Sequence, residues 1–414
     1  NGLEKRPKLR FPGFDEPWNT ALLSDYFVKS TKKNSDGMIS NVICNSAKQG
    51  LIPQREYFDK DIANSDNTNG YYIIESNDFV YNPRKSADAP YGPISSYQYP
   101  EAGIVSPLYL CFRAKREINP LYFEWYFRSS TWHRYIYMSG DSGARHDRVS
   151  IKDDVFFAMP INVPSAKEQE KISLFLDVIE RRIETQRTLV ETLKKYKRGL
   201  SDTLFDRTAQ SPSCKIVKLG DAFELLQNNT FSRDDLTTNP SSVQNIHYGD
   251  VLVKYGAVAN ISEYTPPYIK PTINLQKFVA TSYLRDGDIV FADTAEDYSV
   301  GKATEIAGAN GLAVLSGLHT IPCRPLMKFH PMYLAYYFNS SLFRRQIYPL
   351  VQGTKVSSIS KGELVKTSVY APTEREQRRI ASMLYLLDLR ITFEEKTVNA
   401  LTNTRTALLQ QLFI

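Results

Sequence analysis

Two stretches of the chain share a hydrophobic pattern in which apolar residues recur at alternating steps of four and three positions. They run from Ile172 to Leu204 and from Ile380 to Leu412, and eight of the ten repeating positions in each are apolar. This is a heptad pattern, which is typical of a helix packed along another helix. Neither Gly nor Pro interrupts residues 165–198 or 373–414. The pattern therefore predicts two long helices.

Both helices are expected to begin with the same phrase. PSAKEQEKI starts at Pro164 and PTEREQRRI starts at Pro372, 208 positions later. After each proline, a Ser or Thr stands three residues before a Glu, which is the spacing of a capping box. The two copies align at this offset over roughly forty residues without a gap. The chain therefore contains a long internal duplication.

Polar residues inside the two seams indicate how the helices pair. Lys197 and Gln186 interrupt the first seam, and Glu394 and Arg405 interrupt the second at matching places. A parallel pairing would set Lys197 against Arg405, whereas an antiparallel one can set Lys197 opposite Glu394 and Gln186 opposite Arg405. We therefore predict an antiparallel coiled coil whose register these four residues fix. Two separate amphipathic helices, each covering its own domain, are the alternative.

The segments that precede the helices favour short strands and turns. GYYIIESNDFVYN, GIVSPLYLCF, GDVLVKYGAV and DGDIVFADT read as strands, and aromatic helices are expected at Pro120 and Pro331. The fold class is α+β: two related domains of mixed sheet and short helices, each followed by one of the two long helices. The segments are residues 1–163, 164–208, 209–371 and 372–414.

Composition bounds the class of protein. Of 414 residues, 42% are hydrophobic and 23% are charged, which disfavours a disordered chain. The net charge of +6 permits a polyanionic partner without requiring one. No run approaches the ~20 apolar residues of a membrane-spanning helix. The four cysteines form no C-x-x-C pair, so a reducing cytoplasm is expected. The chain begins at Asn1 rather than Met, which leaves room for a few preceding native residues.

Enzymatic motifs are weak. NPLY, from Asn119 to Tyr122, is close to the N/D-P-P-Y/F/W motif of amino-methyltransferases, but its third residue is Leu and no glycine-rich cofactor loop precedes it. We interpret it as the start of the aromatic helix, where proline is common in the first turn. SVGKAT, from Ser299, lacks the leading glycine of a phosphate-binding loop. We expect no catalytic residues and no metal site in this chain.

The order of variable domain, P-x-x-x-E-Q-x-x-I helix, second variable domain and second such helix resembles the specificity (S, HsdS-type) subunit of Type I restriction-modification systems. The opening LRFPGFDEPW, from Leu9, is also similar to that family. The resemblance covers essentially the whole chain. It implies double-stranded DNA with a bipartite target, two methyltransferase (HsdM-type) subunits that bind S-adenosylmethionine, and restriction (HsdR-type) subunits that bind ATP and Mg. In such subunits the coiled coil separates two target recognition domains that a pseudo-twofold axis relates, sets the spacer and docks the adenine-N6 methyltransferase subunits.

DNA contacts are expected from basic and polar residues on loops, because phosphate contacts supply affinity and base-edge contacts supply sequence choice. In the first domain the candidates are Arg84, Lys85, Tyr91, Ser95, Arg145, His146 and Arg148. In the second they are Lys254, Tyr255, Asn260, Asp297, Tyr298, Lys302, Lys355, Ser357 and Ser358. Two alternatives stay open: a coiled-coil adaptor that binds proteins without DNA specificity, and, more weakly, a stand-alone methyltransferase that uses NPLY.

Overall fold

The computed structural model describes residues 6–57, 68–140, 147–353 and 355–414. The chain divides into two compact units. The first consists of residues 1–187 and 396–414, and the second of residues 188–395. Each unit therefore contains one domain together with one part of each long helix, and the two units are described separately below.

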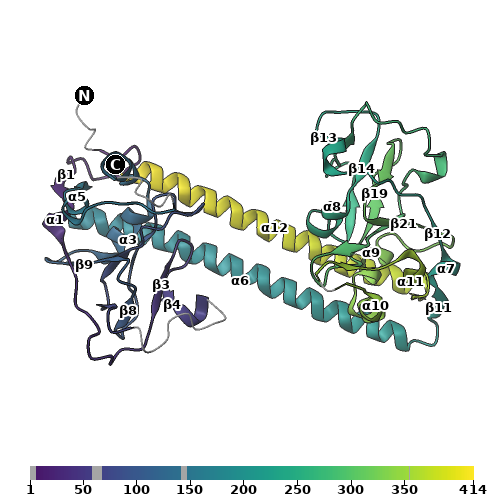
Figure 1. Ribbon diagram of the computed structural model, residues 1–414, viewed down its shortest axis with the longest axis horizontal. Coiled ribbons are helices and arrows are strands. Elements are labelled where there is room, and N and C mark those ends of the chain that lie inside the picture. The colour runs from purple at the N-terminus through teal and green to yellow at the C-terminus, as the bar shows by residue number, and fades with distance from the viewer. Residues whose placement is uncertain (1–5, 58–67, 141–146, 354) are drawn as a thin grey trace. The chain divides into compact units, whose positions relative to one another are not determined.

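The two long helices of the heptad pattern are confirmed. They are α6, Ala166–Gln210, and α12, Glu374–Leu412 (Figure 1). The capping box of α12 is complete, because Thr373 N donates to Glu376 Oε2 at 3.1 Å and Glu376 N donates to Thr373 Oγ1 at 3.3 Å. In α6 only half of the box forms, since Glu168 instead accepts two hydrogen bonds from Arg10, at 2.7 and 2.8 Å.

The glutamine of the repeated phrase also has a structural reason. Gln169 Nε2 donates to the carbonyl of Pro164 at 2.9 Å, and Gln377 Nε2 donates to the carbonyl of Pro372 at the same distance. A side chain in the first turn thus holds the residue that precedes the helix, which fixes the angle at which the chain enters. The repeated P-x-x-x-E-Q therefore encodes a helix start.

Within each unit, α6 and α12 run antiparallel, as predicted. In the first unit, Ile172 and Leu176 of α6 share a buried cluster with Leu409 and Leu412 of α12. In the second unit, Leu204 near the end of α6 shares a cluster with residues near the start of α12, which are Ile380, Ala381 and Leu384. Residues early in one helix therefore pack with residues late in the other.

The predicted register is wrong. Lys197 Nζ contacts Asp388 Oδ1 at 2.5 Å rather than Glu394, and Arg405 Nη1 contacts Glu180 Oε2 at 2.5 Å rather than Gln186. Glu394 instead forms an ion pair with Arg390 of its own helix. The long side chains of Lys197 and Arg405 reach carboxylates beside the seam. Their charges therefore do not require the polar residues inside the seam as partners.

The domain of the first unit is built from short strands and helices. The strands are β1 (Asn19–Leu22), β2 (Phe27–Lys29), β3 (Ile43–Ser46), β4 (Gly50–Pro53), β5 (Tyr72–Ile74), β6 (Phe79–Tyr81), β7 (Ile94–Ser96), β8 (Gly103–Val105), β9 (Leu110–Ala114) and β10 (Pro160–Val163). The helices are α1 (Leu23–Tyr26), α2 (Gln54–Tyr57), α3 (Pro120–Arg128), α4 (His133–Ser139) and α5 (Asp153–Phe157). A four-stranded sheet has the order β2-β9-β6-β7, β3 and β4 form a hairpin, and β5 and β8 form a separate antiparallel pair.

The domain of the second unit has more strands. They are β11 (Lys215–Lys218), β12 (Phe223–Leu225), β13 (Leu236–Thr237), β14 (Gln244–Ile246), β15 (Val258–Asn260), β16 (Tyr268–Ile269), β17 (Ile289–Ala292), β18 (Thr294–Ala295), β19 (Ala303–Ala307), β20 (Val314–Ser316), β21 (Thr320–Pro325), β22 (Ser357–Ser358) and β23 (Ser368–Ala371). The helices are α7 (Leu219–Ala222), α8 (Tyr248–Val253), α9 (Tyr333–Phe338), α10 (Ser341–Ile347) and α11 (Lys361–Leu364), with 3-10 turns η2 (Arg233–Asp235), η3 (Ala280–Ser282) and η4 (Tyr348–Leu350). Its largest sheet has the order β12-β21-β17-β19-β15 and mixes parallel and antiparallel pairs.

The two domains share a scaffold. In each, the first strand pairs antiparallel with the strand that leads into a long helix, β1 with β10 and β11 with β23. In each, a buried Asp on a turn receives two hydrogen bonds from an Arg on the neighbouring strand: Arg113 to Asp78 at 2.6 and 2.7 Å, and Arg324 to Asp288 at 2.9 and 2.7 Å. The α+β class and the duplicated layout are therefore confirmed.

One predicted strand is a helix. GDVLVKYGAV forms α8 before the chain enters β15, because His247 caps the helix by accepting from Gly249 N at 3.2 Å and Asp250 lies in its first turn. Val251 is the buried residue of α8, and an apolar run as short as VLV does not by itself distinguish a helix from a strand.

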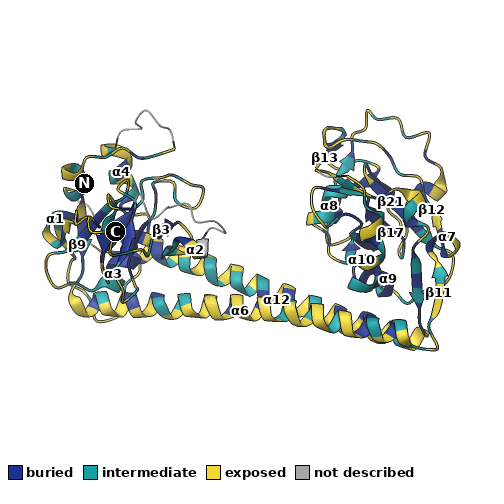
Figure 2. Ribbon diagram, turned by 60° about the horizontal axis from the view of Figure 1, so that its bottom comes forward, coloured by how far each residue is buried: buried dark blue, intermediate teal, exposed yellow. Residues whose placement is uncertain are grey.

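The aromatic helices α3 and α9 belong to the cores. Tyr122 of α3 packs on Phe413 with ring centroids 5.6 Å apart, and Tyr333 of α9 packs on Phe205 at 6.0 Å. Phe413 lies 208 positions after Phe205, so the duplication extends to how the ends of the long helices meet each domain. Figure 2 shows buried residues filling the interior of each domain.

Candidate nucleic-acid interface

A G-(x)-[RK] loop occurs shortly before each long helix: SGARHDRVSI from Ser142 and QGTKVSSIS from Gln352. The described parts of these two loops have equivalent partners in the two domains. In the first domain, Val149 N donates to Pro83 O at 2.9 Å, and in the second, Ile359 N donates to Asp293 O at 2.8 Å. Next to these bonds, the backbones of Arg84 and Arg148 form an isolated antiparallel β-bridge, and Thr294 of β18 pairs with Ser358 of β22. Each domain thus ties the end of its central strand, β6 or β17, to the loop before its last short helix. We call this two-segment ladder the strap.

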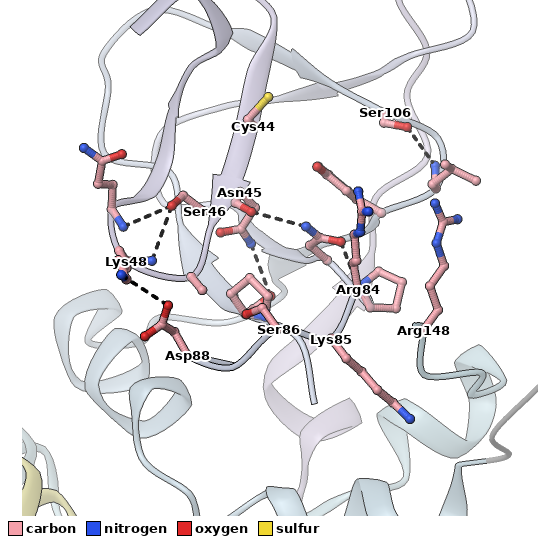
Figure 3. A pocket seen from close by; sticks show the side chains of 17 residues that line it. Cys44, Asn45, Ser46, Lys48, Arg84, Lys85, Ser86, Asp88, Ser106 and Arg148 are labelled. Atoms are coloured by element: carbon pink, nitrogen blue, oxygen red, sulfur yellow. Dashed lines mark hydrogen bonds and ion pairs between the residues drawn. The ribbon is translucent and has the colours of Figure 1, made fainter. Parts of the chain in front are cut away.

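The strap of the first domain borders an open cavity of about 830 Å³. Three of the predicted DNA-binding residues, Arg84, Lys85 and Arg148, line it. In Figure 3, Arg84 and Arg148 extend toward the same side, whereas Lys85 points away from them. The opposite wall is the β3–β4 hairpin, with Lys48 and Gln49 at its turn. The structure therefore gathers three basic candidates of the first domain at one concave surface.

The charges of this cavity are only loosely compensated. Arg84 Nε lies 3.9 Å from Asp147, and Lys48 Nζ lies 3.4 Å from Asp88, with all four side chains more than half exposed. Such exposed pairs contribute little to stability and are easily exchanged for another anion. Arg148 Nε is buried without a hydrogen-bond partner among the described residues. The cavity therefore presents exposed cations of the kind that suit an anionic ligand such as a phosphate backbone.

Two other candidates of the first domain have structural roles. Ser95 is buried, and its hydroxyl donates to Asn45 Oδ1 at 2.9 Å. Tyr91 packs on the ring of His133 at 4.9 Å, and its carbonyl accepts from the Tyr81 hydroxyl at 2.8 Å. The buried Ser95 side chain is therefore used inside the domain, whereas the Tyr91 ring is only partly buried and stays a candidate for a DNA contact. Arg145 and His146 lie outside the described residues.

In the second domain, the strap brings several candidates together. Ser357 and Ser358 form β22 and pair with Ala295 and Thr294 of β18. Lys355 and Tyr298 lie beyond the ends of these strands, and Tyr298 is 86% exposed. Asp297 accepts from Ser299 N at 2.8 Å, and this bonding with Ser299 lowers the pKa of the Asp297 carboxyl. These five residues lie on the β18–β22 ladder or within three residues of its ends, and all of them except Ser357 are exposed; we call them the polar ribbon.

The other candidates of the second domain lie apart from that ribbon or face inward. Lys302 Nζ donates to the carbonyls of Leu252 and Tyr255 at 2.8 and 3.2 Å, and burial lowers its pKa. Tyr255 is 2% exposed, and burial raises the pKa of its hydroxyl. Lys254 covers the ring of Tyr255, and Asn260 holds a turn through Glu263 at 2.8 Å. Lys302 and Tyr255 therefore support α8 and are not presented to a ligand.

Sequence reasoning missed two features of these surfaces. One is the turn of the β3–β4 hairpin, whose residues carry no motif. The other is His319 near the second strap, which adopts a left-handed backbone with φ of 54° and lies 3.3 Å from Asp293. A positive φ is uncommon at residues other than Gly, although His is among the types enriched there, and no sequence pattern predicts it.

NPLY forms a helix start, as interpreted. Asn119 Oδ1 accepts from Tyr122 N at 3.1 Å, and proline occupies the first turn of α3. Tyr122 is fully buried, so its ring cannot stack on a flipped base.

No cluster of three or more His, Cys, Asp or Glu side chains suited to a metal ion occurs in the part of the chain that the structure describes. Within the same residues, no helix has the length and apolar character needed to span a membrane.

Comparisons with known proteins bear on this architecture. No family model matches the chain, and no curated protein matches it. One similar solved chain comes from a structure of the type I R-M system, on the structural basis of its complex assembly and conformational transition. It matches with a TM-score of 0.58 and 16% identity, over 98% of this chain and 99% of that one. The Type I restriction-modification S subunit of M. genitalium matches with a TM-score of 0.54 and 14% identity, over 99% of both chains. The HsdS subunit of Thermoanaerobacter tengcongensis matches with a TM-score of 0.50 and 17% identity, over 99% of both.

The chain has the fold of a Type I specificity subunit. The match extends over nearly the full length of both chains in each comparison, so it includes both domains and both long helices. The sequence resemblance is thereby confirmed at the level of the fold. At 14–17% identity, individual loop residues are not carried over from one specificity subunit to another.

Proposed function

We propose that this chain is the DNA-binding specificity subunit of a Type I restriction-modification complex. Each domain reads one half of a bipartite duplex target, and the helix pair sets the spacer between the half-sites. The observation that supports this most strongly is the strap. Two domains with different loops keep the same ladder, and each presents predicted DNA-binding residues there: Arg84 and Arg148 in one, Ser357 and Ser358 in the other. The specificity-subunit fold supplies the setting.

The partners in this proposal are two adenine-N6 methyltransferase subunits and, for restriction, translocating endonuclease subunits. S-adenosylmethionine binds the former, and ATP and Mg bind the latter. Apolar side chains exposed on the long helices support protein docking, because solvent-facing positions of a helix are ordinarily polar. They are Leu174, Phe175 and Val178 on α6, and Leu386, Leu389 and Phe393 on α12. This chain lends sequence choice and carries none of the catalytic chemistry.

Selection from a randomised duplex library tests the proposal. The expected result is a split consensus with a fixed gap, and an affinity that falls steeply with salt because phosphate contacts release counterions. A sequence-blind response would refute DNA specificity and favour the adaptor alternative. The stand-alone methyltransferase would require that the isolated chain bind S-adenosylmethionine.

A further inference from the structure

The β3–β4 hairpin is a rigid two-stranded ribbon with a polar tip. Ser46 pairs with Gly50, so three residues, Ala47, Lys48 and Gln49, form the turn. Ser46 Oγ accepts from the backbone N–H groups of Lys48 and Gln49 at 3.3 and 3.4 Å, and Gly50 adopts a φ of +70°. A three-residue turn that ends in a left-handed glycine is a common hairpin geometry. The tip therefore has a defined backbone, and its three side chains are exposed.

The base of the hairpin is anchored in the domain. Asn45 is 5% exposed, and its Nδ2 donates to the carbonyls of Val80 and Pro93 at 2.8 and 3.2 Å. Ser95 donates to Asn45 Oδ1 at 2.9 Å, so both functional atoms of the amide are used. Ile43 of β3 and Leu51 of β4 are buried in the same cluster as Val80. A ribbon fixed at its base can hold the side chains at its tip in a set position.

Two cavities lie on the two sides of this hairpin, both within the first unit. The cavity of about 830 Å³ and another of about 600 Å³ are both lined by Ser46, Ala47, Lys48 and Gln49. The far wall of the first is formed by Arg84 and Arg148, and that of the second includes Arg128 of α3 and Arg405 of α12. The tip is thus a ridge between two hollows.

The two hollows differ in charge. Arg128 of the smaller cavity lies 2.9 Å from Glu124, and Arg405 lies 2.5 Å from Glu180, so two of its arginines are held close to acids. In the larger cavity, the contact of Arg84 with Asp147 is 3.9 Å long, and no carboxylate contact is recorded for Lys85 or Arg148 among the described residues. A polyanion is therefore attracted to the larger hollow.

We propose that the tip of the β3–β4 hairpin enters the major groove of the first half-site, with Gln49 reading a base edge and the cavity of Arg84 and Arg148 holding the adjacent phosphate strand. This inference rests on the proposed function. The major groove is about 12 Å wide and admits a two-stranded ribbon, and the Gln amide can pair with adenine through one donor and one acceptor. Lys48 at the same tip contacts phosphate or guanine. No ribbon of this type and position occurs in the described residues of the second domain, so the tip governs one half-site alone.

The test maps DNA methylation in cells that carry the complete system with wild-type chain, Gln49→Ala, Gln49→Glu or Lys48→Ala. Gln98→Ala is the matched control, because Gln98 is exposed in the same domain but lines neither cavity. We expect Gln49→Ala and Gln49→Glu to lose about tenfold in discrimination at one position of one half-site, while the other half-site and the spacer stay unchanged. Gln98→Ala keeps the wild-type consensus.

Each outcome tests either the proposed function or the role of the β3–β4 hairpin. A wild-type protein that directs no split consensus refutes the proposed function. A wild-type split consensus that both Gln49 variants retain overturns the role of the hairpin and leaves the function standing. A uniform loss of methylation at every position also overturns it, because a residue that reads one base changes one position.

Discussion

Lys197 Nζ lies 2.5 Å from Asp388 Oδ1, and the other oxygen of Asp388 accepts a hydrogen bond from the Tyr336 hydroxyl at 2.9 Å. The Lys197 ammonium also lies 5.4 Å from the centre of the Tyr336 ring. One carboxylate thus ties α6, α12 and the aromatic helix α9 together. In the other unit, Arg405 contacts Glu180 at 2.5 Å. These residues occupy the same repeat positions, 208 residues apart, so the duplication preserves one interhelical ion pair in each unit.

Reversing the charge of Lys197 should weaken the second unit. Lys197→Glu sets two carboxylates together at a half-buried site, which should lower the free energy of unfolding by about 1–2 kcal/mol. Adding Asp388→Lys should recover about 1 kcal/mol of that loss. Chemical denaturation of the wild type, both single variants and the double variant measures the coupling.

The matched control for this pair is Lys197→Glu with Glu394→Lys, the partner that the heptad pattern suggested. It should recover nothing, because Glu394 pairs with Arg390. Recovery by the Glu394 double variant and none by the Asp388 double variant would show that the helices adopt the other register.

Glu305 should make the stability of the second unit depend on pH. Burial raises the pKa of its carboxyl to about 7 from 4.5, although the backbone N–H groups of Met332 and Ala335 donate to it at 2.7 and 3.2 Å and oppose the shift. The folded state therefore holds this proton more tightly than the unfolded chain, so the contribution to stability is full below pH 4.5 and is lost as the pH rises to about 7.

The comparison with Glu305→Gln isolates this effect, because Gln keeps an acceptor oxygen but does not titrate. The difference in the free energy of unfolding between wild type and variant should fall by about 2 kcal/mol from pH 5 to pH 8, in favour of the variant at high pH. Denaturant titrations at several pH values measure it. A difference that does not change with pH would show that Glu305 has the same pKa in the folded and unfolded states.

Arg84 should contribute affinity without sequence choice. Loss of one phosphate contact in Arg84→Ala should weaken binding of every duplex alike and reduce the slope of log K against log salt by about 0.9. Titrations at several salt concentrations, with a target duplex and a scrambled one, measure both effects. Lys32→Ala is the control, because Lys32 is 69% exposed in the same domain and lies outside both cavities. An unchanged slope in Arg84→Ala would remove this residue from the interface.

Asn119 should matter for stability and not for chemistry. Asn119→Ala removes the cap of α3 and should cost about 1 kcal/mol. Methylation by the assembled complex should proceed at the wild-type rate at a temperature where the variant is folded. Thermal unfolding and a methyl-transfer assay check the two halves of this statement, and a large loss of rate in a folded variant would revive NPLY as a catalytic motif.

The sequence predicted those features that depend on periodic or repeated local signals. The heptad seams gave both long helices and their antiparallel direction, because burial along one face repeats regularly. The predicted register was wrong because it used only residues inside the seam. The carboxylates that contact Lys197 and Arg405 are Asp388 and Glu180, which lie beside the seam. The strand predicted for GDVLVKYGAV was wrong for a local reason, because the cap at His247 favours a helix over a strand.

The candidate site was predicted in part for a similar reason. The loops at Arg148 and Ser357 could be recognised because they recur before each long helix. The burial of Ser95 and Tyr255 could not, because it depends on which face of a short element meets the core. The exposed hairpin tip with Lys48 and Gln49 was missed because no local sequence pattern shows that a turn lies between two cavities.

The most direct test of the account is a map of methylated adenines in the DNA of cells that carry this chain together with the methyltransferase subunits of its complex. The account predicts methylation at a split sequence, with two short specified half-sites and a gap of fixed length whose bases are free. Methylation that follows one continuous sequence, or that shows no sequence dependence on this chain, would contradict it.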